Sequence, residues 1–172
     1  LGTNKIKNLK SFLADAEIVV PKKLTMTGFG ETIRKIGVDT ETAWGLILSN
    51  LVYTSEFNWW IMHTLPGERY TPAQLLQMLQ ADVTSENSQN HIVSAYKNMF
   101  VSNEILGRRL GLGDCELKSG SKNRVMLSVT RNFWSTPIHE VILYSLYKFA
   151  EACGDYYQFS LSTLMDDSIE RN

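Results

Sequence analysis

Lysine and asparagine side chains recur on the polar sides of two predicted helices and at the tips of two predicted hairpins. Lysine neutralises backbone phosphate without reading sequence, whereas asparagine in the major groove can pair with an adenine edge. The candidate DNA contacts of the first helix and hairpin are Lys5, Asn8, Lys10, Lys22 and Lys23. Those of the second helix and hairpin are Asn90, Ser94, Lys97, Lys122 and Arg124.

The net charge of −1 hides a segregated charge pattern. Residues 1–35 carry a net +4, residues 36–96 a net −5, residues 97–131 a net +4 and residues 132–172 a net −4. Charge separated along the chain in this way can give a nearly neutral protein a basic face, although short windows fluctuate by a few charges in any sequence. The two basic segments are those that contain the candidate contacts.

The first candidate contacts require a helix followed by a hairpin. Apolar residues spaced by three and four predict a helix over Leu1–Ala16, with lysines on its opposite side. The β-branched run Ile18–Val20, the turn Pro21–Lys23 and the segment Leu24–Thr27 predict a short hairpin. A basic helix followed by such a hairpin is typical of the second half of a winged helix. We therefore expect residues 1–36 to form the C-terminal part of such a unit, whose earlier helices would precede Leu1.

Residues 37–70 form the most apolar part of the chain and predict a helical linker or core. Thr40 can cap a helix that continues to Val52, and a second helical run extends from Phe57 to Leu65 before Pro66-Gly67 ends it. Three of the four tryptophans lie here. Large aromatic rings at helical spacing indicate a hydrophobic core more often than a ligand site.

The same order of elements is predicted again over residues 71–131. Thr71-Pro72 opens a helix over Ala73–Ala81, and Ser88 can cap a second helix over Gln89–Phe100. A hairpin is expected next, with one strand at Cys115–Lys118 and the other at Arg124–Thr130. Its turn is basic. This pattern predicts a second winged-helix-like unit.

Residues 132–172 are expected to form a C-terminal helical segment. Thr136-Pro137 opens a helix over Ile138–Ala152, and Gly154 ends it. A short strand over Tyr156–Ser160 and a further helix starting at Ser162 are predicted after it. The predicted fold is thus mainly α with short β-hairpins, as tandem winged-helix-like units joined by a helical core.

Several kinds of chemistry have no motif in the chain. There is no Walker loop, dinucleotide fingerprint or HExxH helix, and the three histidines are too scattered to suggest a metal cluster. The two cysteines form no CxxC pattern, which fits a reducing cytoplasm. No apolar run approaches the length of a membrane span. We expect a cytoplasmic protein that is not an enzyme, binds no metal or cofactor and has no membrane partner.

Four segments resemble a bacterial domain family of unknown function, number four thousand and seven in the unknown-function series. These segments are LGTNKIKNLKSFLADAEIV, LTMTGFGETIRK, TAWGLILSNLVYTSEFNWWIMHTL and PIHEVILYSLYKFAE. The chain departs from the family pattern at Ile47-Leu48, where the family frequently has a histidine. The family is named for its association with phosphoadenosine phosphosulfate reductase-like proteins. The resemblance implies a setting in DNA sulfur modification and phage defence, and it supplies no catalytic residues.

Two functions are compatible with these observations. The first is a DNA-binding accessory protein of a bacterial DNA sulfur-modification or phage-defence system, with double-stranded DNA as its ligand. The second is a non-catalytic scaffold that docks a phosphoadenosine phosphosulfate reductase-like enzyme through the acidic segments. Salt-sensitive binding to DNA would favour the first, and a stable protein complex that survives loss of the lysines would favour the second.

Overall fold

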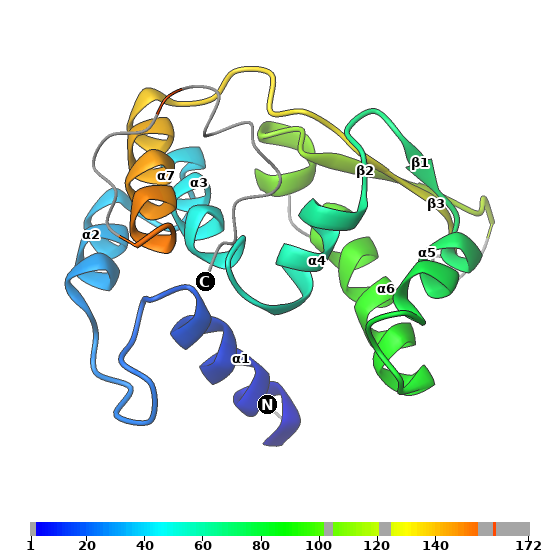
Figure 1. The fold of residues 1–172 in the computed structure, drawn as a ribbon, viewed down its shortest axis with the longest axis horizontal. Helices are drawn as coiled ribbons and strands as arrows, with labels where there is room; N and C mark the ends of the chain where they lie inside the picture. Colours follow the sequence, from blue (N-terminus) through cyan, green and yellow to red (C-terminus); the bar gives the residue numbers. More distant parts are fainter. Residues whose placement is uncertain (1–2, 102–104, 121–124, 155–159, 161–172) are drawn as a thin grey trace.

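The computed structural model describes residues 3–101, 105–120, 125–154 and 160 (Figure 1). These residues form a mainly helical fold with one small antiparallel sheet. The α-helices are α1 (Thr3–Asp15), α2 (Gly28–Ile36), α3 (Glu41–Leu51), α4 (Ser55–His63), α5 (Pro72–Leu79), α6 (Glu86–Val101) and α7 (His139–Ala152). A π-helical turn, η1, spans Ile105–Arg109, and the strands are β1 (Arg69–Tyr70), β2 (Gly113–Leu117) and β3 (Met126–Arg131).

Threonine side chains fix the starts of three helices. The hydroxyl of Thr27 accepts a hydrogen bond from the backbone N–H of Gly30 at the start of α2, and Thr40 does the same for Ala43 of α3. Thr71 forms a capping box with Gln74, followed by Pro72 at the first helical position of α5. These contacts satisfy N–H groups that the first helical turn cannot pair internally.

The sheet joins strands that are far apart in the sequence. Its order is β1-β3-β2, with both neighbours antiparallel to the central strand. The predicted hairpin is confirmed as β2 and β3, where Cys115 faces Val129. The two-residue strand β1 adds Arg69 opposite Thr130, a pairing that the sequence did not predict.

One hydrophobic cluster lies where α2, α3, α7 and the end of α1 meet. Its buried members include Ala16, Ile33, Leu46, Ile47 and Val141. Helices α3 and α7 approach closely at Gly45, because a Cβ built on this glycine would lie 2.8 Å from both Val141 Cγ2 and a ring carbon of Trp134. In Figure 1 these helices form the left half of the molecule.

A second cluster packs α4, α5 and α6 against the sheet. Trp60 is almost completely buried at its centre, with its ring centroid 4.7 Å from that of Tyr96 and 5.9 Å from that of Phe100. Its other buried members include Leu75, Leu79 and Val129. Because α4 and β1 belong to it, the domain boundary predicted at residue 71 falls inside one continuous core.

The first predicted hairpin is not a ladder of paired strands. Its segments meet only at an isolated bridge between Val19 and Met26, around a turn in which Lys22 and Leu24 have positive φ. The Thr27 N–H donates to the Ile18 carbonyl as part of this bridge, and the Thr27 side chain caps α2, so the chain enters a helix instead of extending the pairing. The apolar stripe expected on the first helix is also only partly covered, because Ile6 and Leu9 are exposed.

The other predicted helices agree with the structure within a few residues. Helices α5, α6 and α7 correspond to the segments expected over Ala73–Ala81, Gln89–Phe100 and Ile138–Ala152. The strand and helix predicted after Gly154 fall, apart from Ser160, outside the described residues. Within the described part of the chain, no helix is both long and apolar enough to cross a membrane.

Candidate nucleic-acid interface

Helix α6 has one buried side and one polar side. Val93, Tyr96 and Phe100 pack inward, together with the buried amide of Gln89, which donates to the Val83 carbonyl at 2.6 Å. The exposed residues at spacings of three and four are Asn87, Asn90, His91, Ser94 and Asn98. All five side chains carry hydrogen-bonding groups, so this surface can present donors and acceptors to a ligand.

The polar side of α6 is almost free of formal charge. Lys97 is the only lysine or arginine in the helix, and Glu86 at its start is the only acidic residue. Lys97 is half-buried instead of fully exposed, and it lies near β2, where its charge lowers the pKa of Cys115 in opposition to burial and Asp114, which raise it. Glu86 lies one turn before Asn90 on the same surface, and its backbone carbonyl accepts a 3.0 Å hydrogen bond from the Asn90 amide.

The β2–β3 hairpin supplies basic groups at its tip. Lys118 follows β2 directly and is exposed, while its N–H donates to the Val125 carbonyl at 2.8 Å and so holds the base of the turn. Gly120 has a positive φ of 73°, which suits a tight turn. The candidate contacts Lys122 and Arg124 lie outside the described residues.

The candidate contacts of the first unit are exposed but belong to a different part of the molecule. Lys5, Asn8 and Lys10 lie on α1, and Lys22 and Lys23 lie in the turn that precedes α2. No residue of α1 belongs to the hydrophobic cluster that holds α6. The structure thus gathers Asn90 and Ser94 on one helix surface, and it does not join them to the first set through a common core.

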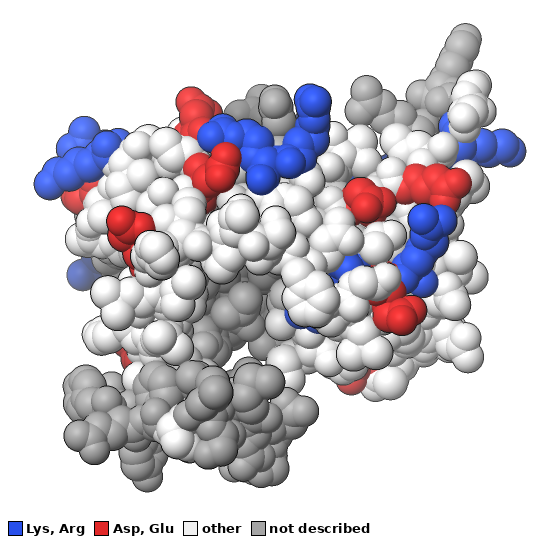
Figure 2. Space-filling view, turned by 90° about the horizontal axis from the view of Figure 1, so that it is seen from above, with Lys and Arg blue, Asp and Glu red and all other residues white. Residues whose placement is uncertain are grey.

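Two arginines outside the candidate contacts are already paired with carboxylates. Arg69 of β1 lies 3.2 Å from Glu116, and Arg109 lies 3.0 Å from Glu41 while it also donates to the Asp39 carbonyl. Figure 2 shows the face seen from above, where lysine and arginine occur in separate groups, most of them beside aspartate or glutamate. Among the residues that the structure describes, the basic side chains on this face are therefore divided between separate groups.

His63 lies at the end of α4, where its ring contacts Trp59 and Asp82. Its ring stacks on Trp59 at 4.8 Å, and its Nδ1 lies 3.0 Å from the Trp59 carbonyl. Asp82 accepts a 2.8 Å hydrogen bond from the Trp59 indole and lies 3.5 Å from His63 Nε2. This cluster joins α4 to the end of α5. Among the described residues, no three His, Cys, Asp or Glu side chains gather into a possible metal site.

Comparison of the chain with protein-family models, with curated proteins and with solved structures found no match in any of the three. The family resemblance described above therefore remains a prediction.

Sequence reasoning missed two features of the region around α6. The first is Asn87, which extends the polar surface by one turn toward the start of α6. The second is a cavity lined by Arg131 and several aromatic rings. Helical spacing places Asn87 on the same side of α6 as Asn90 and Asn98, so the sequence contained the signal for it. The cavity is lined by residues from distant segments and has no local signal in the sequence.

Proposed function

We propose that this protein binds double-stranded DNA through α6 and the β2–β3 hairpin. The observation that carries the proposal is the order α4-β1-α5-α6-η1-β2-β3 together with the sheet order β1-β3-β2. Apart from η1, this is the order expected of a winged helix, in which the α-helix before the hairpin enters the major groove. Here that helix is α6. The family resemblance adds a bacterial DNA sulfur-modification or phage-defence system as the setting.

The polar surface of α6 supports contacts to bases. Asparagine can pair with the N6 and N7 positions of adenine, and serine can donate to or accept from several base edges. Asn87, Asn90, Ser94 and Asn98 are exposed on one side of the helix, where Glu86 at its start is the single carboxylate of α6. We therefore expect a preference for some sequences that depends on these side chains.

Phosphate contacts are assigned to the hairpin and to one lysine of α6. Lys118 is exposed beside the turn, Lys122 and Arg124 belong to the segment between the strands, and Lys97 lies on α6. If each of these four groups neutralises one phosphate, the logarithm of affinity should fall against the logarithm of salt concentration with a slope of about −3.5. Lys5, Lys10, Lys22 and Lys23 can add contacts where the DNA extends past α1.

Fluorescence anisotropy with labelled duplexes of different sequence, over a salt series, tests this proposal. Lys118→Gln should weaken binding to all duplexes and make the slope less negative by about 0.9. The control Lys35→Gln makes the same charge change on an exposed residue of α2. If Lys118 acts at the interface, Lys35→Gln should bind the duplexes with the affinity and salt slope of the wild type.

A second pair of variants separates base contacts from phosphate contacts. Asn90→Ala combined with Asn98→Ala should reduce the difference in affinity between duplexes while leaving the salt slope unchanged. The control is Gln77→Ala combined with Gln80→Ala on the exposed side of α5. Changing Lys5, Lys10, Lys22 and Lys23 to glutamate measures how much residues 1–36 contribute to the affinity for DNA. Failure of the folded wild type to bind any duplex at low salt would overturn the proposal.

An alternative function is that of a non-catalytic scaffold, and an apolar surface on α7 favours it. Leu143 is 72% exposed and Tyr147 is 59% exposed, and they line an open groove of about 570 Å³ with Leu46, Tyr144 and Ala150. Exposed apolar area of this kind is common at protein interfaces. Purification with a phosphoadenosine phosphosulfate reductase-like protein, and loss of that complex in Leu143→Glu, would favour this function.

A further inference from the structure

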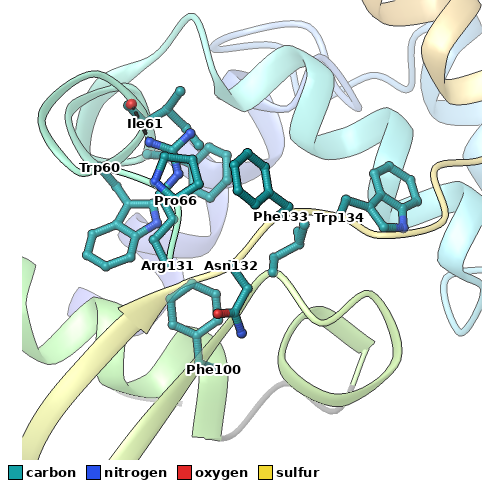
Figure 3. Close-up of a pocket in the computed structure, with 10 residues that line it drawn as sticks. Trp60, Ile61, Pro66, Phe100, Arg131, Asn132, Phe133 and Trp134 are labelled. Carbon is teal, nitrogen blue, oxygen red and sulfur yellow. Dashed lines mark hydrogen bonds between the residues drawn. The ribbon is translucent and has the colours of Figure 1, made fainter. Parts of the chain in front are cut away.

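A small cavity lies between the end of α4, the end of β3 and the residues that follow β3. Its volume is about 170 Å³, and its wall includes Trp60, Pro66, Phe100, Arg131, Phe133 and Trp134 (Figure 3). A cavity of about 150 Å³ in another protein is large enough to hold benzene. The cavity therefore has room for a ligand with one ring.

Among the described residues that line this cavity, Arg131 alone is charged. One of its terminal nitrogens, Nη1, donates a 2.7 Å hydrogen bond to the Ile61 carbonyl and a second bond to the Thr64 carbonyl, at the C-terminal end of α4. Within the described part of the chain, neither its Nε nor its other terminal nitrogen has an acceptor, and no carboxylate pairs with the guanidinium. Two carbonyl groups thus bind one edge of the guanidinium and leave donors available.

The surroundings make the unpaired charge of Arg131 unfavourable. The side chain is half-buried, and burial lowers the pKa of Arg131, while Tyr70 acts in the opposite direction. A half-buried cation is stabilised by an anion that accepts its remaining N–H groups, and the planar guanidinium fits a carboxylate with two parallel hydrogen bonds. Asn132 also lines the cavity but is uncharged. Its amide nitrogen lies 3.4 Å from Oδ2 of Asp114, a carboxylate that does not line the cavity.

Aromatic rings form much of the remaining wall. Trp60 and Phe100 come from the buried core, whereas Phe133 is 71% exposed. In Figure 3 the Arg131 side chain extends from the end of β3 toward Ile61 and Pro66, with Trp60 and Phe133 on either side. A ring placed in the cavity would contact Phe133 and cover apolar area that is otherwise in water.

We propose that this cavity binds a small aromatic carboxylate, with the carboxylate on Arg131 and the ring against Trp60, Phe100 and Phe133. The site is separate from the proposed DNA surface and does not depend on it. It nevertheless contacts two elements of the proposed DNA surface, because Phe100 belongs to α6 and Arg131 ends β3.

Titration with benzoate tests this proposal on the full chain. Trp60 and Trp134 line the cavity, so tryptophan fluorescence should change in a saturable way, and saturation-transfer NMR should detect the bound ring. Benzyl alcohol has the ring without the charge, and acetate has the charge without the ring. Both should bind at least about tenfold more weakly than benzoate, because a hydrogen bond to a charged group is lost in the first and the apolar contact in the second.

Variants of two lining residues assign the site. Arg131→Met should weaken benzoate binding by about tenfold to a hundredfold and leave benzyl alcohol unaffected. Arg69→Met removes the same charge from the neighbouring strand, away from the cavity, and should bind benzoate like the wild type. Should Arg131→Met fail to fold, Phe133→Ala provides the second test, because this exposed residue can be truncated without opening the core.

Three outcomes would overturn the proposal. They are the absence of saturable benzoate binding to natively folded protein, equal affinity for benzoate and benzyl alcohol, and benzoate affinity that Phe133→Ala leaves unchanged. DNA binding enters none of these measurements, so the result is independent of the proposed function.

Discussion

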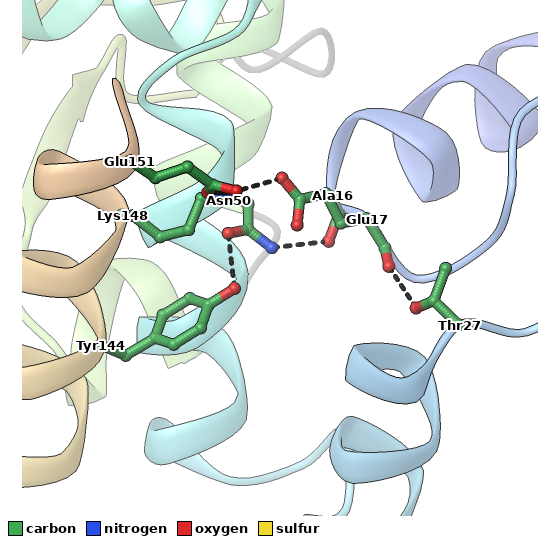
Figure 4. A network of polar contacts seen from close by, with 7 residues as sticks. All are labelled: Ala16, Glu17, Thr27, Asn50, Tyr144, Lys148 and Glu151. Atoms are coloured by element: carbon green, nitrogen blue, oxygen red, sulfur yellow. Dashed lines mark hydrogen bonds and ion pairs between the residues drawn. The ribbon is translucent and has the colours of Figure 1, made fainter. Parts of the chain in front are cut away.

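The Nζ atom of Lys148 lies 2.8 Å from Oε1 of Glu17, a residue 131 positions earlier in the chain (Figure 4). The same ammonium group donates to Glu151, one turn further along α7. Lys148 is buried, whereas about half of each carboxylate side chain remains exposed. Burial alone would lower the pKa of Lys148, but the hydrogen bonds to Glu151 and Glu17 outweigh it and raise the pKa. This contact ties the turn after α1 to α7.

Lys148→Met should lower the free energy of unfolding by about 1 kcal/mol at neutral pH, because the methionine keeps the packing but loses both ion pairs. The exposed Lys35→Met on α2 is the control and should change it by less than about 0.5 kcal/mol. Since the pKa of Lys148 is higher in the folded state, its contribution is fully present below the ordinary lysine pKa of 10.5 and declines only as the pH rises above it. Urea denaturation at several pH values measures this, and a difference lost near neutrality would contradict it.

Tyr144→Phe should destabilise the protein by about 1–2 kcal/mol, because it leaves a buried oxygen without a donor. The Tyr144 hydroxyl donates to Asn50 Oδ1 at 2.8 Å, and Asn50 is 2% exposed while its amide nitrogen donates to the Ala16 carbonyl. Tyr147→Phe removes the same hydroxyl from an exposed neighbour on α7. Equal unfolding midpoints for the two variants would show that the Asn50 contact contributes nothing.

Cys115 should react slowly with thiol reagents in the folded protein. Burial, and to a smaller extent Asp114, raises the pKa of Cys115 from 9.0 to about 11. At pH 8 the folded thiolate fraction should therefore be roughly a hundredfold below that in urea. The rate of reaction with a disulfide reagent, measured in a Cys153→Ser background, checks this value. Equal rates with and without urea would contradict it.

The same pKa shift predicts how stability changes in alkaline solution. The folded state holds the Cys115 proton more tightly than the unfolded chain, so this contribution is present below pH 9.0 and is lost as the pH rises toward about 11. Cys115→Ser removes it. The wild type should therefore lose stability relative to Cys115→Ser over that interval.

Gly45→Ala should destabilise the contact between α3 and α7. The added methyl group would lie 2.8 Å from Val141 Cγ2, so the helices must separate, and overpacking of this kind costs about 1–3 kcal/mol. The higher helix propensity of alanine offsets up to about 1 kcal/mol of this. Gly28→Ala, at the start of α2, meets no atom within 4 Å and should be neutral or slightly stabilising. Thermal unfolding should give a lower midpoint for Gly45→Ala than for the wild type, and a midpoint for Gly28→Ala that is equal to or slightly above that of the wild type.

Local signals in the sequence were sufficient for much of the helical fold. Thr71-Pro72 predicted the start of α5, and the alternating residues before Arg131 predicted β3. These features depend on neighbours a few positions away, which a single sequence displays. The prediction of the first hairpin was wrong because it used the same local information. The β-branched residues favour a strand, but Thr27 caps α2 and the pairing stops after one bridge.

Features built from distant segments could not be predicted. Strand β1 has two residues and gains its partner about sixty positions later, so it has no periodicity of its own. Lys148 and Glu17 are 131 positions apart, and only the fold brings them together. The same holds for Arg131, whose surroundings come from α4, α6 and the segment after β3. Of the candidate contacts, Asn90 and Ser94 were predicted as exposed because helical spacing alone determines their side.

The central position of β3 has a consequence for how the chain folds as it is synthesised. Helix α4 and strand β1 leave the ribosome long before β3, yet β1 has no other strand to pair with in the described sheet. Until Arg131 has emerged, Trp60 and its neighbours lack the strand that covers them, and the nascent chain presents aromatic surface to water. Ordering of β1 and of the core around Trp60 must therefore wait for non-local contacts with β3.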